Sequence, residues 1–154
     1  MYVRFHKAFT MIELVFVIVV IGIISAIALP RFGESVESAY DAKAKNAVAI
    51  IQSAITTERQ KLILRGLINK NVTSLEDASG QLFNGINGDT NNAVLSSPVT
   101  PCANNSSKYC WSKSGTTYTY HSNSTTVNFT LSGNKFTCTI DTSDSGKLCR
   151  YLTE

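Results

Sequence analysis

The sequence is poor in charged residues, which make up 16% of its 154 positions, and their signs nearly cancel. Fourteen Lys and Arg stand against eleven Asp and Glu, and two of the positive charges, Arg4 and Lys7, lie within the first eight residues. The remainder of the chain is close to neutral. A protein that binds nucleic acid through a dedicated basic surface carries a larger positive excess. The composition therefore argues against that class of protein.

Histidine is also scarce, with only His6 and His121 in the chain. His121 falls at the expected end of a strand, and no acid or reactive cysteine is paired with it in the sequence. Nucleophilic or acid–base catalysis needs a base beside a nucleophile and a third group that orients the base. Internal repeats, low-complexity tracts and nucleotide-binding motifs are missing as well. We therefore expect a protein that is not an enzyme and that uses no cofactor.

The metal-binding patterns are weak. Zinc sites use short ligand pairs, whereas stretches of seven, 27 and ten residues separate the four cysteines. A calcium loop at Asn87, Asp89 and Asn91 would hold one carboxylate and lacks a distal glutamate, so we expect a plain surface loop there and no metal. The cysteines lie in a segment rich in Ser, Thr, Asn and Gly, which favours two disulfides formed in an oxidising compartment. They are Cys102, Cys110, Cys138 and Cys149.

Against these absences stands one long apolar segment near the N-terminus. The 21 residues from Phe9 to Leu29 would span about 31 Å as a helix, close to the hydrocarbon thickness of a bilayer. Arg4 and Lys7 precede the segment, and the positive-inside rule then keeps the N-terminus in the cytoplasm and exports the rest. This orientation agrees with the independent argument from the cysteines.

A secretory signal peptide is the alternative interpretation of the same segment. Ala26-Ile27-Ala28 provides a small-x-small cleavage site, and cleavage after Ala28 would release a soluble periplasmic binding protein. Glu13 counts against this alternative. An acid inside an apolar segment costs up to about 2.5 to 3.5 kcal/mol at the membrane centre, and a segment that is discarded has no reason to carry one.

The residues around Glu13 carry a resemblance to a known family. The stretch Lys7-Ala8-Phe9-Thr10-Met11-Ile12-Glu13-Leu14, followed by an apolar run with Gly22 and Pro30, resembles the N-terminal signature of type IV prepilins and of the pseudopilins of type II secretion and DNA-uptake systems. The resemblance implies a leader peptide, residues 1–8, that a prepilin peptidase removes between Ala8 and Phe9. It also implies N-methylation of Phe9. Most members have glycine before the cut, where this chain has the equally small Ala8.

The resemblance further implies how the mature chain is used. Glu13 becomes the fifth residue, where the family's acid pairs with the terminal amine of a neighbouring subunit during filament assembly, and such a pair is strongly favoured in a low dielectric. Gly22 and Pro30 fall on the family's helix-loosening positions. Residues 9–30 would be the transmembrane and assembly half of a long helix, and residues 31–154 a globular head.

The implied partners are copies of the chain, other pilins or pseudopilins, the prepilin peptidase and an inner-membrane assembly platform. Nucleic acid would be a partner only in a DNA-uptake system. Before assembly the chain would cross the bacterial inner membrane once, with a cytoplasmic N-terminus. Afterwards it would lie in a periplasmic pseudopilus or a cell-surface pilus. Two disulfides favour a type IV pilin or a transformation-type pseudopilin over a secretion pseudopilin, because a C-terminal disulfide is more usual among true pilins.

The head is expected to begin with an amphipathic helix over residues 34–65 that ends at Gly66. Its apolar positions follow helical spacing at Val36, Tyr40, Ala44, Ala47, Val48, Ile51 and Ile55. Pro30 would bend the helix where its two halves meet. Residues 66–115 form a turn-rich loop region, with one short helix around Ser74 to Phe83. Within it, the segment from Lys108 to Lys113 is either core aromatics beside a disulfide or a small patch for single-stranded DNA.

The last segment, residues 116–154, alternates apolar and polar side chains and predicts a β-meander. A two-residue turn at Gly133-Asn134 would pair Leu131 with Phe136, Phe129 with Cys138 and Val127 with Ile140. A further strand across the loop 142–145 would place Cys149 opposite Cys138. Among three connectivities this favours Cys138–Cys149 and, by elimination, Cys102–Cys110. The expected fold is α+β and type IV pilin-like, with a long bent N-terminal helix packed on a small antiparallel β-sheet.

Overall fold

The structure, a computed structural model, describes residues 9–154 apart from 78, 80, 97–98, 100 and 105–106, with residues 29–34 and 90 described by their backbone alone. The chain divides into two compact units, residues 1–36 and residues 37–154, and we call the second the head. The elements are α1 (Met11–Leu64), the 3-10 helix η1 (Thr90–Asn92), β1 (Cys110–Ser114), β2 (Thr117–His121), β3 (Thr126–Ser132), β4 (Lys135–Cys138) and α2 (Asp144–Thr153).

Helix α1 contains both of the predicted helical segments in one element of 54 residues. Its predicted C-terminal cap is confirmed, because Gly66 has a positive φ of 76°. The Gly66 N–H donates to the Ile63 carbonyl at 2.9 Å and the Leu67 N–H to the Leu62 carbonyl at 2.8 Å. These two bonds form a Schellman motif, which satisfies carbonyls that the helix leaves unpaired. The bend expected at Pro30 concerns how the two units are arranged and stays a prediction.

Within the head, α1 contributes one buried stripe to the core. Ala44, Val48, Ile51 and Ile55 are nearly inaccessible to solvent, and their spacing of four, three and four residues places them on one face of the helix. Ala47 is only partly buried against this core. The predicted stripe is therefore confirmed in its central part, whereas Val36 and Tyr40, at its N-terminal end, are exposed.

The four strands form an antiparallel meander in the order β1-β2-β3-β4. The predicted hairpin register is confirmed for Leu131 with Phe136 and for Phe129 with Cys138. Gly133 and Asn134 both have positive φ angles, 58° and 62°, as the type I′ hairpin turn requires. The third predicted pair is wrong, because β4 ends at Cys138 and Ile140 is half exposed outside the sheet.

Two features of the predicted loop region differ from the structure. Strand β1 lies inside residues 66–115, where we expected no strand, and it pairs with β2 from Ser114 opposite Thr117 to Cys110 opposite His121. The short helix expected from Ser74 to Phe83 is also wrong. Among the described residues of that stretch none is helical, and Glu76 instead forms an isolated bridge with Leu82.

The predicted last strand is wrong as well, because residues 144–153 form helix α2. The Ser143 side chain caps this helix by accepting from the Gly146 N–H at 3.0 Å, and Cys149 and Leu152, three residues apart, are buried on one face. Both disulfides nevertheless have the predicted pairing, Cys138–Cys149 and Cys102–Cys110. Cys149 reaches Cys138 because the helix packs against the sheet, not because it continues the meander.

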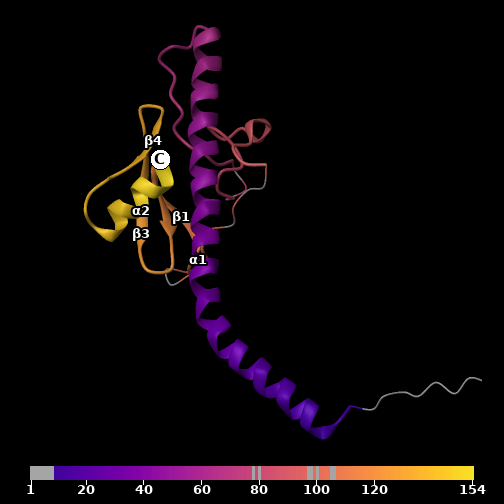
Figure 1. Ribbon diagram of the computed structural model, residues 1–154. Coiled ribbons are helices and arrows are strands. Elements are labelled where there is room, and N and C mark those ends of the chain that lie inside the picture. Colours follow the sequence, from indigo (N-terminus) through magenta and orange to yellow (C-terminus); the bar gives the residue numbers. More distant parts are fainter. Residues whose placement is uncertain (1–8, 78, 80, 97–98, 100, 105–106) are drawn as a thin grey trace, which may run out of the picture. The chain divides into compact units, whose positions relative to one another are not determined.

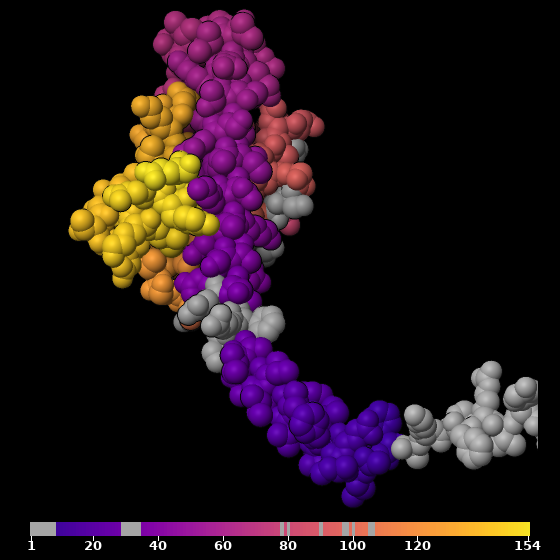
Figure 2. Space-filling view, in the orientation of Figure 1, coloured from indigo at the N-terminus to yellow at the C-terminus, as the bar shows by residue number. Residues whose placement is uncertain are grey.

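Figure 1 shows the sheet and α2 beside one side of α1 in the head, and turn-rich segments beside the other. Polar contacts fix these neighbours: Gln52 of α1 donates to the Phe136 carbonyl of β4 at 3.3 Å, and the Tyr120 hydroxyl of β2 donates to Asp41 of α1 at 2.9 Å. In Figure 2 the yellow residues of α2 lie directly against α1, where the Lys45 ammonium sits 5.0 Å from the Tyr151 ring centre. The head thus forms one core around α1.

Candidate functional site: the N-terminal assembly segment

The first part of α1 exposes apolar side chains on all sides. The window Met11–Ala28 has a mean hydropathy of 2.8, none of it is buried, and it is long and apolar enough to cross a membrane. Phe16, for example, is 68% exposed. Removing such a side chain from water is favourable by about 1.5 to 3 kcal/mol. The segment therefore favours an apolar environment that its own chain does not supply.

The helix begins with a cap that our sequence analysis missed. The Glu13 N–H lies 3.3 Å from the Thr10 hydroxyl oxygen and 3.1 Å from the Thr10 carbonyl oxygen. Thr10 therefore satisfies a backbone donor that the first helical turn leaves open. The spacing Thr10-Met11-Ile12-Glu13 is the sequence signature of a capping box, which identifies this helix start. The carboxylate of Glu13 also lies in the first turn, where the helix dipole favours negative charge.

The other predicted assembly residues are placed as follows. Phe9 precedes the helix and is 77% exposed, whereas Ala8 and the leader 1–8 lie outside the described residues. Gly22 lies on an open surface, since nothing is within 4 Å of where a Cβ atom would be. Pro30 is part of the backbone of α1. Glu13 forms no ion pair with any described residue.

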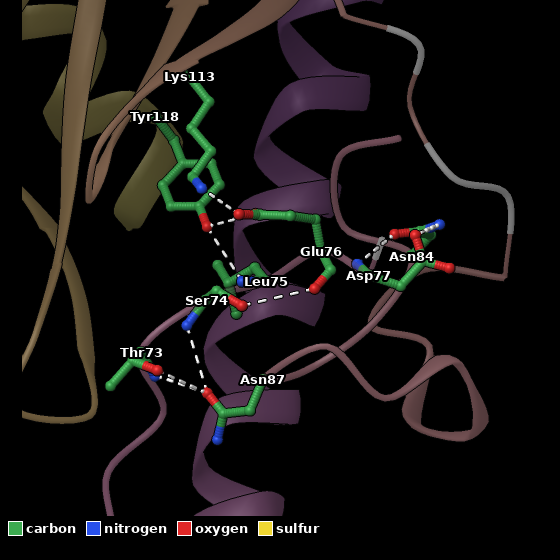
Figure 3. Close-up of polar contacts among 9 residues, drawn as sticks. All are labelled: Thr73, Ser74, Leu75, Glu76, Asp77, Asn84, Asn87, Lys113 and Tyr118. Atoms are coloured by element: carbon green, nitrogen blue, oxygen red, sulfur yellow. Dashed lines mark hydrogen bonds and ion pairs between the residues drawn. The ribbon is translucent and has the colours of Figure 1, made fainter. Parts of the chain in front are cut away.

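A second polar cluster lies in the head and holds the loop after α1 against the sheet (Figure 3). The Tyr118 hydroxyl donates to Glu76 Oε2 at 2.7 Å and accepts from the Leu75 N–H at 3.0 Å, and Lys113 pairs with the other oxygen of Glu76. Burial raises the pKa of Tyr118, and the hydrogen bond to Glu76 raises it further. These contacts join three segments of the head, so we interpret the cluster as a structural clamp.

The residues considered as a calcium loop also hold the loop region together. The Asn87 side-chain oxygen accepts from the Thr73 N–H at 2.7 Å, and Asp89 caps η1 by accepting from the Asn91 N–H at 2.9 Å. Among the residues that the structure describes, no group of three or more His, Cys, Asp or Glu is arranged to hold a metal. The side chains of Asn87 and Asp89 thus fix backbone turns.

One of the two aromatic side chains before and within β1 belongs to the core. Trp111 is 3% exposed, whereas Tyr109 is partly buried and stacks on the exposed Tyr40 of α1 with ring centres 4.4 Å apart. Of the two interpretations of this segment, core aromatics beside a disulfide is therefore confirmed for Trp111 alone. His121 lies with Nε2 2.8 Å from the Ser112 hydroxyl, and among the described residues no acid forms an ion pair with it.

Comparisons with known proteins agree with the N-terminal geometry. Residues 4–29 match the family model described as the prokaryotic N-terminal methylation motif. The chain therefore carries a prepilin-type N-terminal methylation motif at these residues. The type IV narrow pilus major component PilA5 of Thermus thermophilus is 48% identical over 48 residues, 31% of this chain and 41% of that protein. The match thus covers less than half the length of this relative, and no solved structure matches the chain.

Proposed function

We propose that this chain is a structural subunit of a type IV pilus or pseudopilus and that it polymerises through its N-terminal helix. The observation that carries the proposal is the fully exposed apolar window Met11–Ala28, which lies within the matched methylation motif. Before assembly, lipid would cover this surface, and in the filament the same segments of other subunits would replace the lipid. The role is structural and needs no catalytic group.

Processing is part of the proposal. A prepilin peptidase would remove residues 1–8 by cutting between Ala8 and Phe9, and Phe9 would then be N-methylated. The resulting amine carries a positive charge next to the first turn of α1. Glu13 of a neighbouring subunit would pair with that amine, because opposite charges attract most strongly where water is excluded. This pair would set the axial register of each new subunit.

The particular filament is a finer proposal. The relative PilA5 is named as the major component of a narrow pilus, and this chain has two disulfides in its head. Both observations favour a pilus, or a DNA-uptake pseudopilus, over a secretion pseudopilus. The partners would be copies of the chain, other pilins and the inner-membrane assembly platform.

The first experiment is intact mass spectrometry with N-terminal sequencing of the mature protein from cells, before and after reduction. We expect a start at N-methylated Phe9 and a mass gain of about four hydrogens on reduction, since each disulfide takes up two. A start at Leu29 would instead identify a secreted soluble domain that was cut after Ala28. That result would end the assembly role of Glu13, because residue 13 would be absent from the mature protein.

The second experiment replaces Glu13 with alanine. We expect the variant to insert into the membrane but to lose at least nine-tenths of its filaments, because the buried amine of the neighbour would be left without a counter-charge. Glu13→Asp keeps the charge and should restore part of the assembly. Asp144→Ala, at an exposed acid of the head, is the matched control and should assemble normally. Normal filaments from Glu13→Ala would contradict the proposed role.

A further inference from the structure

A hollow of about 410 Å³ lies in the head between α1 and the loop that contains η1. Helix α1 lines it with a row of side chains spaced three or four residues apart, and the loop lines it with two side-chain amides. Six of the lining residues carry the argument: Ile50, Ala54, Glu58, Lys61, Asn91 and Asn92. The volume falls in the range of pockets that hold small molecules, about 300 to 1,000 Å³. Nothing in the proposed filament role uses it.

One of the residues that line the hollow is a buried acid. Glu58 is only 7% exposed, and its Oε2 atom accepts no hydrogen bond from the described residues. The Lys61 ammonium lies 3.3 Å from this oxygen, yet its hydrogen bond goes to the Asn92 side-chain oxygen at 3.2 Å. A buried carboxylate oxygen without a donor is costly. Lys61 therefore supplies a counter-charge to Glu58, but Oε2 still lacks a hydrogen-bond donor among the described residues.

The charges around the hollow favour a cation. Asp89 accepts from the side-chain amides of Asn91 at 3.1 Å and Asn92 at 3.0 Å, so one of the two N–H donors of each amide is already bonded to a carboxylate. The side-chain oxygen of Asn92 stays on the side of Lys61. Glu58 and Lys61 thus line the hollow as an ion pair, and a second carboxylate, Asp89, is bonded to the two amides that line it. An arriving anion would be repelled, whereas a second ammonium would find both a counter-charge and an amide oxygen.

We propose that this hollow binds a primary ammonium group carried on a short aliphatic chain. The ammonium donates to Glu58 Oε2 and displaces Lys61, whose side chain is 44% exposed. The aliphatic chain packs against Ile50 and Ala54, which give the hollow its apolar wall. A free alkylamine and a lysine side chain of a second copy of this protein share this chemistry. The binding chemistry does not depend on the proposed filament role.

Nuclear magnetic resonance of the isotope-labelled full chain in detergent micelles tests the binding. We expect n-butylammonium chloride to shift the signals of Glu58 and of the Asn92 side chain and to saturate, while n-butanol and equal concentrations of sodium chloride do not. Glu58→Gln should weaken binding at least fivefold, and Glu37→Gln, at a partly buried acid of the same helix that does not line the hollow, should not change it. Equal binding by wild type and Glu58→Gln, or no saturable shift, would overturn the proposal.

Two further variants keep the result independent of any folding defect in Glu58→Gln. Lys61→Met removes the competing ammonium and should strengthen binding several-fold, whereas unchanged or weaker binding would overturn the displacement. Ala54→Phe fills the hollow without changing its charge and should abolish binding. Both substitutions fall at partly or fully exposed positions of α1, so we expect the two disulfides and the core to be unchanged. Mass spectrometry and the NMR spectrum of each variant check this.

Carbodiimide coupling then distinguishes the two sources of the ammonium. The reagent joins a carboxylate to an amine in contact with it, and samples assembled from a mixture of light and heavy isotope-labelled copies show which chain supplied the amine. A light–heavy peptide that joins Glu58 to a lysine identifies a second copy. Amidation of Glu58 only when butylamine is added identifies a free amine. Neither product in samples that are intact would overturn the site. Failure to assemble would bear on the filament role and leave the micelle experiment to decide the binding.

Discussion

The apolar side chains of helix α1 are arranged differently in two parts of the helix. Between Met11 and Ala28 they point in all directions and none is buried, whereas between Ala44 and Ile55 they form one stripe that the head covers. A helix that is apolar all round belongs in lipid or inside a larger assembly, and a helix with one apolar stripe belongs on the surface of a globular core. The head therefore buries the apolar stripe of its part of α1, whereas the apolar side chains of the N-terminal segment stay exposed.

The carboxylates of the two regions differ in the same way. In the head, Asp41 accepts from Tyr120 and from the Ser122 hydroxyl, and Glu76 accepts from Tyr118 and pairs with Lys113. Glu13 has no such side-chain partner among the described residues. An acid that enters a low dielectric needs a donor or a counter-charge. The assembly proposal supplies that group to Glu13 from a neighbouring subunit.

The largest expected effect comes from the same substitution made in both regions. Phe129→Ala removes a fully buried ring of β3 that stacks on Phe136 with centres 4.8 Å apart, and we expect it to lower the free energy of unfolding by about 3 to 5 kcal/mol. Phe16→Ala removes a ring that is exposed in the single chain and should leave the unfolding of the head unchanged. Denaturant unfolding in detergent, followed by the fluorescence of the single tryptophan, Trp111, measures both.

Equal losses of stability from these two variants would contradict the proposed difference between the two regions. They would mean that the head depends on the N-terminal segment for its own folding. The reverse pattern is expected for filament yield, where Phe16→Ala should reduce assembly although the head of the monomer remains as stable as in wild type.

Removal of the C-terminal disulfide is expected to have the next largest effect. Cys138–Cys149 ties α2 to β4 with Cα atoms 6.0 Å apart, and a crosslink over so short a loop contributes about 2 to 3 kcal/mol. The double variant Cys138→Ser/Cys149→Ser should therefore unfold at a lower denaturant concentration than wild type under non-reducing conditions. If α2 contributes nothing to the stability of the head, the denaturation midpoint will stay within error of wild type, and α2 will unfold separately from the rest of the head.

Much of this organisation could be predicted from local patterns. The helical spacing of Ala44 to Ile55, the Gly66 cap and the Gly133-Asn134 turn each depend on neighbouring residues only, and the structure confirms all three. The hairpin register follows from the turn, because a two-residue loop fixes which residues face each other. The methylation motif is local too, and it is confirmed at residues 4–29.

The errors arise where the decisive signal is short or distant. Strand β1 was missed because only Trp111 of its five residues is fully buried, so its alternation is too short to detect. Helix α2 was mistaken for a strand, although Ser143 followed by Asp144 is the start of a capped helix. The clamp of Tyr118 on Glu76 joins residues 42 positions apart, and no local pattern encodes such a contact.

The third prediction concerns alkaline pH and the clamp. The pKa of Tyr118 is raised in the folded head, so its contribution to stability is complete below the ordinary tyrosine pKa of 10.0 and is lost as the pH rises above it. Tyr118→Phe should lower the free energy of unfolding at pH 7 by about 1 to 2 kcal/mol, because Glu76 and the Leu75 N–H lose their partner. The variant should also lose less stability than wild type between pH 10 and 12. A parallel decline of both proteins over that range would show that Tyr118 does not carry the effect.

The smallest effect is expected at acid pH, at the exposed turn before α2. Asp141 accepts from the hydroxyl and from the N–H of Ser143, the latter at 2.8 Å, and these bonds hold the pKa of its carboxyl below the ordinary value of 3.8. A lowered pKa contributes stability that is complete above pH 3.8 and is lost as the pH falls through the folded value. Asp141→Asn keeps the shape but not the charge, so its denaturation midpoint should be slightly below that of wild type at pH 6, and the difference should shrink as the pH falls below 3.8. A difference that does not shrink would assign the effect to the packing of Asp141 against Gly146 and not to its charge.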